Sequence, residues 1–474
     1  MQQASFALSE HTIFDHIADI SQAASGSMTP QTKKKFAAYF TPKALSDHLI
    51  RIANYRGGKL GDHGAGAGIL SATAAARYID TGASKPCLLT AYEIQPDIQP
   101  FLKRTYDALS QYAQTRGATV DYDLQGDFTA LATQALSTAH GDYDSIIINP
   151  PYFKIAANAP VNLEIDRLLG FRAPNIYAAF MLISLHLLKP NGSLTALVPR
   201  SFFNGAYFKP LRQYLKKIAC IDSVTRYRSR SNLFKGDNVL QENCLVKFSR
   251  RAQQSEITVF TCEDPTQEAT ETMSIPADVL LENEHDIFLL PADEAELKAY
   301  LRIRALPHTL SSLGNKLSTG KLVEHRHAES LNASGEGALY IEAKCMDTSS
   351  RHYQHKHSPR NRGNALHITE STQKTLIDNQ PLILLKRISS NSERRRVHAS
   401  LLTAAQYSGE KLALSNSVQY LHGESLQTPA HAEALLSHLR SDDIELAMRA
   451  INGTTQINQH DFDLLRFPTL TPTH

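Results

Sequence analysis

Short apolar runs alternate along the first half of the chain with segments whose apolar residues recur at helical spacing. This alternation is typical of β-strands joined by α-helices, and it predicts a mostly parallel sheet with helices on both faces. A first strand is expected to end in the glycine-rich turn 61–68. Further strands are expected at 87–93, 120–128, 143–148, 194–199, 219–224 and 243–248, and helices at 8–24, from Pro42 onward, from Ile69 to Tyr78, and at 175–188.

The periodic pattern weakens after residue 250, and this change divides the chain. A length of 474 residues predicts two or three domains. Residues 1–250 read as a helical arm and an α/β domain, 251–300 as a linker or insertion, and 301–474 as a mixed domain of short strands, turns and helices. Glu296-Leu297-Lys298 has the E-x-K spacing of some nucleases, but no acid in a convincing strand precedes it, so a nuclease site is not expected.

The tetrapeptide Asn149-Pro150-Pro151-Tyr152 follows the apolar strand 143–148. Proline cannot continue a central strand, so the chain turns at the carboxyl end of that strand. Ligands of open α/β sheets bind at such ends. Acceptors from the Asn149 side chain and the Pro150 carbonyl suit a planar exocyclic amine, because they concentrate charge on its nitrogen as it attacks. Tyr152 would stack on the ring that carries the amine. The simpler alternative is an ordinary Asn-Pro turn.

Three other strand ends carry residues suited to a nucleoside ligand. The turn Gly61-Asp62-His63-Gly64-Ala65-Gly66-Ala67-Gly68 opens a helix, and its glycines allow a ligand to approach the backbone. Glu93 ends the second strand at the place where Rossmann-like folds use an acid to bind ribose hydroxyls. Asp127 ends the third. Thr41 is expected to cap the helix that begins at Pro42.

Composition restricts the class of protein. The chain has 42% hydrophobic and 20% charged residues, as soluble globular proteins do, and it has no signal peptide or membrane-length apolar run. Its five cysteines are scattered without a CxxC pair, which favours reduced thiols in the cytosol and argues against a zinc site. We therefore expect a cytoplasmic protein that binds no metal and no membrane.

The net charge of +2 conceals a basic region. Residues 301–400 hold 16 Lys and Arg against 8 Asp and Glu, which suggests an anionic partner, although a solvated charged face is the alternative. One basic stretch, 351–362, is rich in histidine and is read as a polar loop. The other runs from Lys386 to Arg396.

Together these motifs resemble the γ-type DNA adenine-N6 methyltransferases of type II restriction systems, in the order of that family. Phe40-Thr41-Pro42 is similar to the upstream cofactor motif, Asp62–Gly68 to the S-adenosylmethionine loop, and Asn149–Tyr152 to the catalytic motif. His63 departs from the proline that the family often has. The segments 385–390 and 451–458 resemble the PstI/BsuBI branch.

The resemblance implies a Rossmann-like S-adenosylmethionine-dependent methyltransferase sheet and a C-terminal mixed α+β target-recognition domain. It assigns catalysis to Asn149, Pro150, Pro151, Tyr152 and Phe234, the last packing on a flipped adenine. It assigns the cofactor to Phe40, Thr41, Pro42, Asp62, Gly64, Gly66, Glu93, Asp127, Phe128 and Asn149. It assigns DNA contacts to Lys386, Arg387, Asn391, Arg394, Arg395 and Arg396.

The implied partners are double-stranded DNA and a separate restriction endonuclease, and the implied state is a monomer near the bacterial nucleoid. Two other readings stay open. A methyltransferase acting on RNA adenine or on a protein glutamine amide would need the same acceptors at Asn149 and Pro150. A DNA-binding module with a decayed catalytic half is the non-enzymatic alternative.

Overall fold

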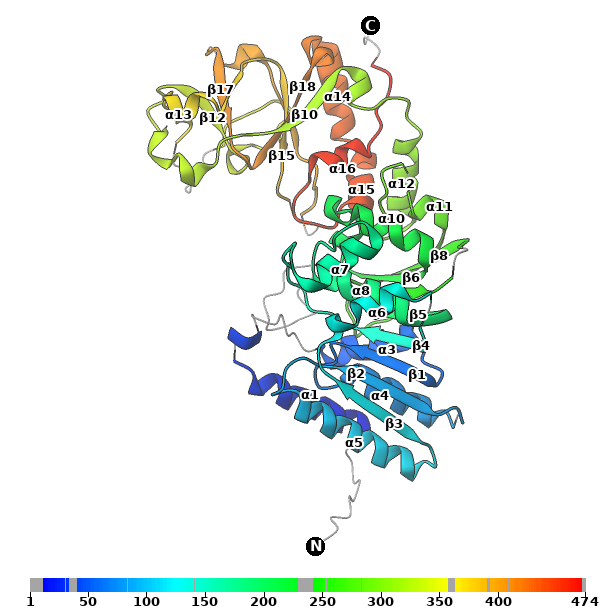
Figure 1. Ribbon diagram of the computed structural model, residues 1–474. Helices are drawn as coiled ribbons and strands as arrows, with labels where there is room; N and C mark the ends of the chain where they lie inside the picture. The colour runs from blue at the N-terminus through cyan, green and yellow to red at the C-terminus, as the bar shows by residue number, and fades with distance from the viewer. Residues whose placement is uncertain are drawn as a thin grey trace. The chain divides into compact units, whose positions relative to one another are not determined.

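The computed structural model describes residues 12–29, 31–33, 41–82, 84–139, 141–228, 242–251, 254–282, 284–356, 363–389, 393–407 and 409–470. The chain divides into two compact units, Met1–Leu289 and Leu290–His474 (Figure 1). Each unit is described by itself. Phe40, Phe234 and Asn391, which the sequence assigned to binding or catalysis, lie outside the described residues.

Among the described residues of the first unit, nine strands form one sheet in the order β3-β2-β1-β4-β5-β7-β6-β8-β9. They are β1 (Gly58–His63), β2 (Cys87–Tyr92), β3 (Val120–Gln125), β4 (Tyr143–Ile148), β5 (Leu188–Pro199), β6 (Cys220–Tyr227), β7 (Asn243–Ser249), β8 (Glu256–Cys262) and β9 (Ala269–Pro276). The first five are parallel, and β7 runs antiparallel between β5 and β6. This is the Rossmann-like α/β fold expected of a methyltransferase.

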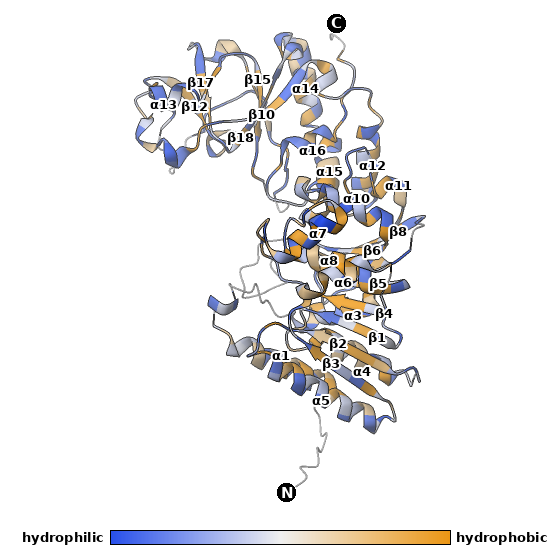
Figure 2. Cartoon of the chain, in the orientation of Figure 1, coloured by the Kyte–Doolittle hydropathy of each residue, from blue (hydrophilic) through white to orange (hydrophobic). Residues whose placement is uncertain are grey.

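Helices pack on this sheet with their apolar side chains inward. Those of the first unit are α1 (Ile13–Ser27), α3 (Lys43–Ala53), α4 (Ile69–Asp80), α5 (Gln99–Thr115), α6 (Ala132–Ser137), α7 (Pro160–Leu169), α8 (Ile176–Leu187), α9 (Ser201–Asn204), α10 (Lys209–Ile218) and α11 (Ala277–Leu280). Helix α5 mixes hydrophilic and hydrophobic residues along its length, as a surface helix does (Figure 2).

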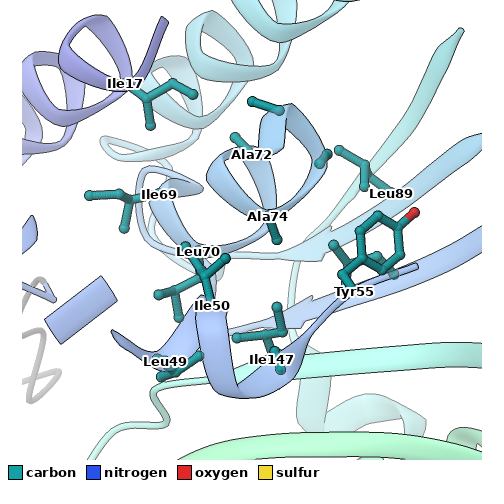
Figure 3. Packing of buried hydrophobic residues seen from close by; sticks show 14 of the residues in the cluster. Ile17, Leu49, Ile50, Tyr55, Ile69, Leu70, Ala72, Ala74, Leu89 and Ile147 are labelled. Carbon is teal, nitrogen blue, oxygen red and sulfur yellow. The ribbon is translucent and has the colours of Figure 1, made fainter. Parts of the chain in front are cut away.

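The core of the first unit joins α1, α3, α4 and α5 to the sheet. Ile17, Leu49 and Leu70 come from three of these helices and belong to one cluster with Leu89 and Ile147 from strands β2 and β4 (Figure 3). Since all five side chains are almost completely buried, this core fixes the strands whose carboxyl ends carry the predicted site.

Residues 251–300 differ from the expected linker or insertion. Strands β8 and β9 fall there and extend the sheet beyond β6. Most side chains of β9 are exposed, so this strand lacks the apolar run by which a strand is recognised in a sequence. Strand β8, in contrast, alternates buried and half-buried side chains. The boundary between the units follows Leu289.

The second unit is mixed α+β. Its described residues form a sheet in the order β10-β18-β15-β16 and another in the order β11-β13-β12-β17-β14. The strands are β10 (Asn315–Thr319), β11 (Leu331–Asn332), β12 (Ala338–Ile341), β13 (Ala365–Leu366), β14 (Leu376–Asp378), β15 (Leu382–Lys386), β16 (Ala399–Leu402), β17 (Lys411–Leu414) and β18 (Val418–Gly423). The helices are α12 (Glu294–Arg304), α13 (Glu370–Gln373), α14 (Pro429–Leu439), α15 (Asp442–Ile451) and α16 (Gln459–Asp463).

The cysteines are part of the two cores. Cys87, Cys220, Cys244, Cys262 and Cys345 are all buried and unbridged. Burial raises the pKa of the Cys244 thiol to about 12. Within the residues that the structure describes, no helix combines the length and the apolar character that crossing a membrane requires.

Candidate active site

A cavity of about 690 Å³ opens at the carboxyl ends of β1 to β4. Its size falls within the range of sites that hold a small organic ligand. Thr41, Gly64, Gly66, Glu93, Asp127, Phe128, Asn149, Pro150, Pro151 and Tyr152 all line it. Predicted cofactor residues and predicted catalytic residues are therefore brought to one place, although they are spread over more than a hundred positions of the chain.

The Asn149 carboxamide is held on both sides. Its Nδ2 donates to Thr41 Oγ1 over 2.9 Å. The Tyr152 hydroxyl lies 3.0 Å from Asn149 Oδ1 and 3.0 Å from the carbonyl oxygen of Leu197 on β5, so its one proton is shared between two acceptors. A carboxamide oxygen has two lone pairs. The arrangement therefore orients the amide oxygen as an acceptor at the cavity wall.

Thr41 does not cap the helix that follows it. Helix α3 begins at Lys43, and Pro42 occupies the capping position without a side-chain hydrogen bond. The Thr41 hydroxyl accepts from Asn149 instead, while its carbonyl accepts from Ser46 Oγ over 3.3 Å. Pro42 is not among the described residues that line the cavity, so its part is to start α3 and thereby place Thr41.

Glu93 ties the glycine-rich turn to the end of β2. Its Oε2 accepts from Gly66 N over 2.9 Å and its Oε1 from Gln95 N over 2.8 Å. Burial raises the pKa of this carboxyl, and the two backbone donors oppose that rise. The side chain is held rigidly at the cavity wall, and each carboxylate oxygen has a further lone pair with which to accept a ligand hydroxyl.

Gly64 and Gly66 both have positive φ, at 82° and 56°. A Cβ on Gly64 would sit 3.4 Å from the Phe180 ring and 3.9 Å from Pro151. The turn therefore adopts a backbone that favours glycine, and it presents bare backbone to whatever occupies the cavity.

Asp62 lies beneath the turn and not at the cavity wall. It is 1% exposed, and its Oδ2 accepts from the Ser71 backbone N–H over 3.2 Å and from Ser71 Oγ over 2.6 Å. Burial raises the pKa of Asp62 to about 6, against the effect of those bonds. This corrects the prediction of direct cofactor contact, because a side chain so enclosed acts by anchoring α4 under the turn.

An aromatic cluster supports the third strand end. His63 stacks on Phe128 with ring centroids 4.0 Å apart, and its Nδ1 lies 2.8 Å from Ser184 Oγ. Burial lowers the pKa of His63 to about 3, so the ring is neutral. Asp127 Oδ1 accepts from Thr129 N over 2.9 Å and so caps the turn that carries Phe128.

The sequence did not single out Ile94, Phe153 or Phe180, which also line the cavity. Ile94 is 54% exposed and Phe153 40%, so both offer apolar surface at the opening. Ile94 follows Glu93 and Phe153 follows Tyr152, so their positions beside strand-end motifs were a usable signal. Phe180 comes from the uniformly apolar helix α8, where nothing in the pattern distinguishes it.

Comparison with known proteins agrees with this geometry. The model of the Eco57I restriction-modification methylase family matches residues 96–234, a range that contains the Asn149–Tyr152 motif. The chain is 28% identical over 467 residues to the type II methyltransferase M.PstI of Providencia stuartii, covering 95% of this chain and 90% of the relative. It is 27% identical over 455 residues to M.BsuBI of Bacillus subtilis, covering 93% and 89%.

The chain is thus similar to type II methyltransferases over most of its length. The resemblance predicted from its motifs is thus confirmed. In fold this methyltransferase homologue is similar to the type IIL restriction-modification enzyme MmeI, with a TM-score of 0.54 and 11% identity over 94% of this chain and 78% of that one. It is also similar to the type ISP enzyme LlaBIII, with a TM-score of 0.53 and 10% identity over 96% of this chain and 41% of that one.

The predicted DNA-binding residues of the second unit fall into two groups. Arg396 is completely buried, so it cannot reach a phosphate. Arg395 is bound within the unit, donating to Asp442 Oδ1 over 2.8 Å and to two backbone carbonyls. The Arg396 assignment is corrected, because internal partners enclose its guanidinium group. The Arg395 side chain is 31% exposed, and its DNA contact stays a prediction. Lys386 and Arg387 are half-buried and Arg394 is exposed.

Proposed function

We propose that this chain is a site-specific DNA methyltransferase that moves a methyl group from S-adenosylmethionine to the N6 amine of adenine. Asn149 carries the proposal, because its amide oxygen is fixed at a cavity that also holds a glycine-rich turn and a ribose-type acid. The similarity to type II methyltransferases is the reason for proposing DNA as the substrate. A bacterial cytoplasmic enzyme, paired with a separate endonuclease, is the setting that this function implies.

In this proposal the residues of the chain bind the cofactor, orient the target base and polarise its amine. Gly64, Gly66 and Glu93 receive the cofactor, and the apolar walls at Ile94 and Phe128 receive its adenine. The cofactor supplies an activated methyl group on a positively charged sulfur. Asn149 Oδ1 and the Pro150 carbonyl would accept from the two N6–H groups and so concentrate charge on the nitrogen. The N–C bond would form as the bond between the methyl carbon and sulfur breaks, with its electron pair left on the sulfur. The extra proton leaves to water.

The target base has to leave the duplex to reach this position, at a cost of a few kcal/mol. The predicted stacking of Tyr152 on the flipped adenine remains a proposal, as does that of Phe234. The Tyr152 ring stands edge-on to Tyr177 with centroids 5.9 Å apart, and this contact fixes its plane.

The function is tested by methyl transfer from labelled S-adenosylmethionine to unmethylated plasmid DNA, with the modified bases mapped by position. N6-methyladenine confined to one short sequence is expected. Cofactor binding without label in DNA would contradict the proposal and direct attention to RNA adenine or a protein glutamine amide. Failure to bind the cofactor would favour a decayed DNA-binding module.

Thr41→Val is expected to slow methyl transfer about 10-fold without changing DNA affinity. Valine keeps the shape of threonine but removes the acceptor of Asn149 Nδ2, so the catalytic amide is held less firmly. Single-turnover kinetics measure the effect. Thr41→Ser is the matched control, because it restores a hydroxyl, and equal rates for the valine variant and the wild type would contradict the role.

Glu93→Gln is expected to weaken S-adenosylmethionine binding by about 10- to 100-fold, since hydrogen bonds to an ionised acceptor are roughly twice as strong as neutral ones. Replacement also puts an amide donor opposite the Gly66 or Gln95 N–H. Calorimetric titration gives the dissociation constant. Asp97→Asn makes the same chemical change at an exposed position nearby and should leave binding unaltered.

A further inference from the structure

Two segments far apart in the sequence are paired in the second unit. Ile388 and Gln456 form an antiparallel bridge. Ser389 N donates to the Thr455 carbonyl over 2.9 Å, and Ile457 N donates to the Arg387 carbonyl over 2.9 Å. We call this element, residues 387–389 with 454–457 and the adjacent Arg394, the paired loop. It follows β15 on one side and α15 on the other (Figure 1).

A buried polar network holds the paired loop from beneath. The Arg396 guanidinium is completely enclosed and donates to the carbonyls of Asn452 and Thr454. The Arg396 and Val397 backbone N–H groups donate to Glu445, over 2.8 Å and 3.1 Å to Oε2.

The same network continues through Asn452, another fully buried residue. Its Oδ1 accepts from Thr454 N over 2.7 Å, and its Nδ2 donates to the Gln456 carbonyl over 2.9 Å. Buried groups that are satisfied in this way rigidify the backbone around them. The backbone of the loop is therefore fixed in advance.

The side chains on the outer side of the paired loop are exposed to solvent. Ile388 is 49% exposed, and Arg394, Thr455 and Gln456 are exposed as well. Within the part of the chain that the structure describes, the side chains of Arg394, Thr455 and Gln456 make no hydrogen bond or ion pair. Lys386 differs, because it lies 3.3 Å from Glu393. A rigid scaffold thus displays an amide, a hydroxyl, a guanidinium and an aliphatic group.

These are the side-chain types that distinguish base pairs. Glutamine bonds adenine through two atoms, arginine bonds guanine, threonine bonds either, and apolar groups contact the thymine methyl. The basic surplus of residues 301–400 supplies attraction to an anionic partner, and Arg387 and Arg394 give the paired loop itself a positive charge. The arginines suit contact with phosphates, whereas the uncharged Thr455 and Gln456 side chains offer the hydrogen-bonding groups that base edges need.

We propose that the paired loop reads the target sequence of duplex DNA in a groove, with Gln456 and Thr455 contacting base edges. This inference rests on the proposed DNA methyltransferase function and adds to it the part of the second unit that sets specificity. The two residues proposed to contact base edges come from 454–457, and the basic stretch contributes residues 387–389 and Arg394 to the loop.

The test maps every methylated position produced by the full-length wild type and by Gln456→Leu in the same mixed-sequence DNA. The variant is expected to accept more than one base at one position of the site and to lose about 10- to 100-fold in discrimination there. The salt dependence of DNA binding should stay unchanged, because no phosphate contact is removed. Thr455→Val is expected to relax a neighbouring position.

Gln373→Leu is the matched control, since Gln373 is an exposed glutamine on α13 in the same unit. Thermal unfolding of all variants should match the wild type, as both replaced glutamines are at the surface. Unchanged base preference for Gln456→Leu, beside a wild type that methylates a defined site, would overturn the paired-loop inference alone. A wild type that methylates no DNA would overturn it together with the proposed function.

Discussion

Replacing Asn149 with alanine is expected to reduce methyl transfer by at least about 100-fold, because preorganised groups that meet developing charge contribute roughly that much to a rate. The carboxamide is fixed by Thr41 and Tyr152 at the wall of the cavity, and alanine offers no acceptor in its place. Transfer of label to plasmid DNA under single-turnover conditions measures the loss.

The substitution should slow the methyl-transfer step without weakening the binding of DNA. The DNA affinity of Asn149→Ala should stay within a few-fold of the wild type, because the second unit is untouched. Asn158→Ala is a matched control, since Asn158 is exposed in the loop just beyond the motif. Turnover by Asn149→Ala at the wild-type rate would refute the active-site assignment.

Replacing Arg396 with alanine is expected to destabilise the second unit by about 3–5 kcal/mol, the usual cost of breaking a buried charged network. The carbonyls of Asn452 and Thr454 lose their donor, and a cavity of guanidinium size remains. The corresponding fall in melting temperature is about 10 °C for a unit of this length. Chemical denaturation followed by circular dichroism gives the free energy of unfolding.

Arg394→Ala is the matched control for the effect of Arg396→Ala on stability. Its side chain is exposed, so its removal should change the free energy of unfolding by less than about 0.5 kcal/mol. Two arginines placed two residues apart are therefore expected to differ almost completely in their effect on folding. If Arg396→Ala were as stable as the wild type, the buried network would not be what holds the paired loop.

The strand ends could be predicted from the sequence because their signal is local. Strands β1 to β4 are each followed by a glycine-rich turn, an acid or an Asn-Pro pair, and parallel strands bring such ends to one edge of a sheet. Glu93 and Asn149 accordingly line one cavity. The partners of these residues were not predictable in the same way. Thr41 lies 108 positions from Asn149, and nothing near Thr41 indicates that its hydroxyl accepts from that amide.

The partners of the arginines in the basic stretch of the second unit were also not predictable from the sequence. Arg394, Arg395 and Arg396 read as one cationic patch, since charge runs are usually exposed. The groups that enclose Arg396 come from Glu445, Asn452 and Thr454, roughly fifty positions further along. Local composition cannot distinguish a guanidinium in water from one bonded to distant carbonyls. Strand β9 was missed for a related reason, because its exposed polar residues resemble a loop.

The burial of all five cysteines has a practical consequence for labelling the protein with a fluorophore at a chosen site. Thiols enclosed in the two cores are slow to meet alkylating reagents, and the raised pKa of Cys244 keeps that group in its unreactive protonated form. A single cysteine introduced at the surface would then carry a fluorophore almost alone, with the native thiols left in place. At Tyr207, which is 86% exposed, such a label would report on the first unit as DNA arrives.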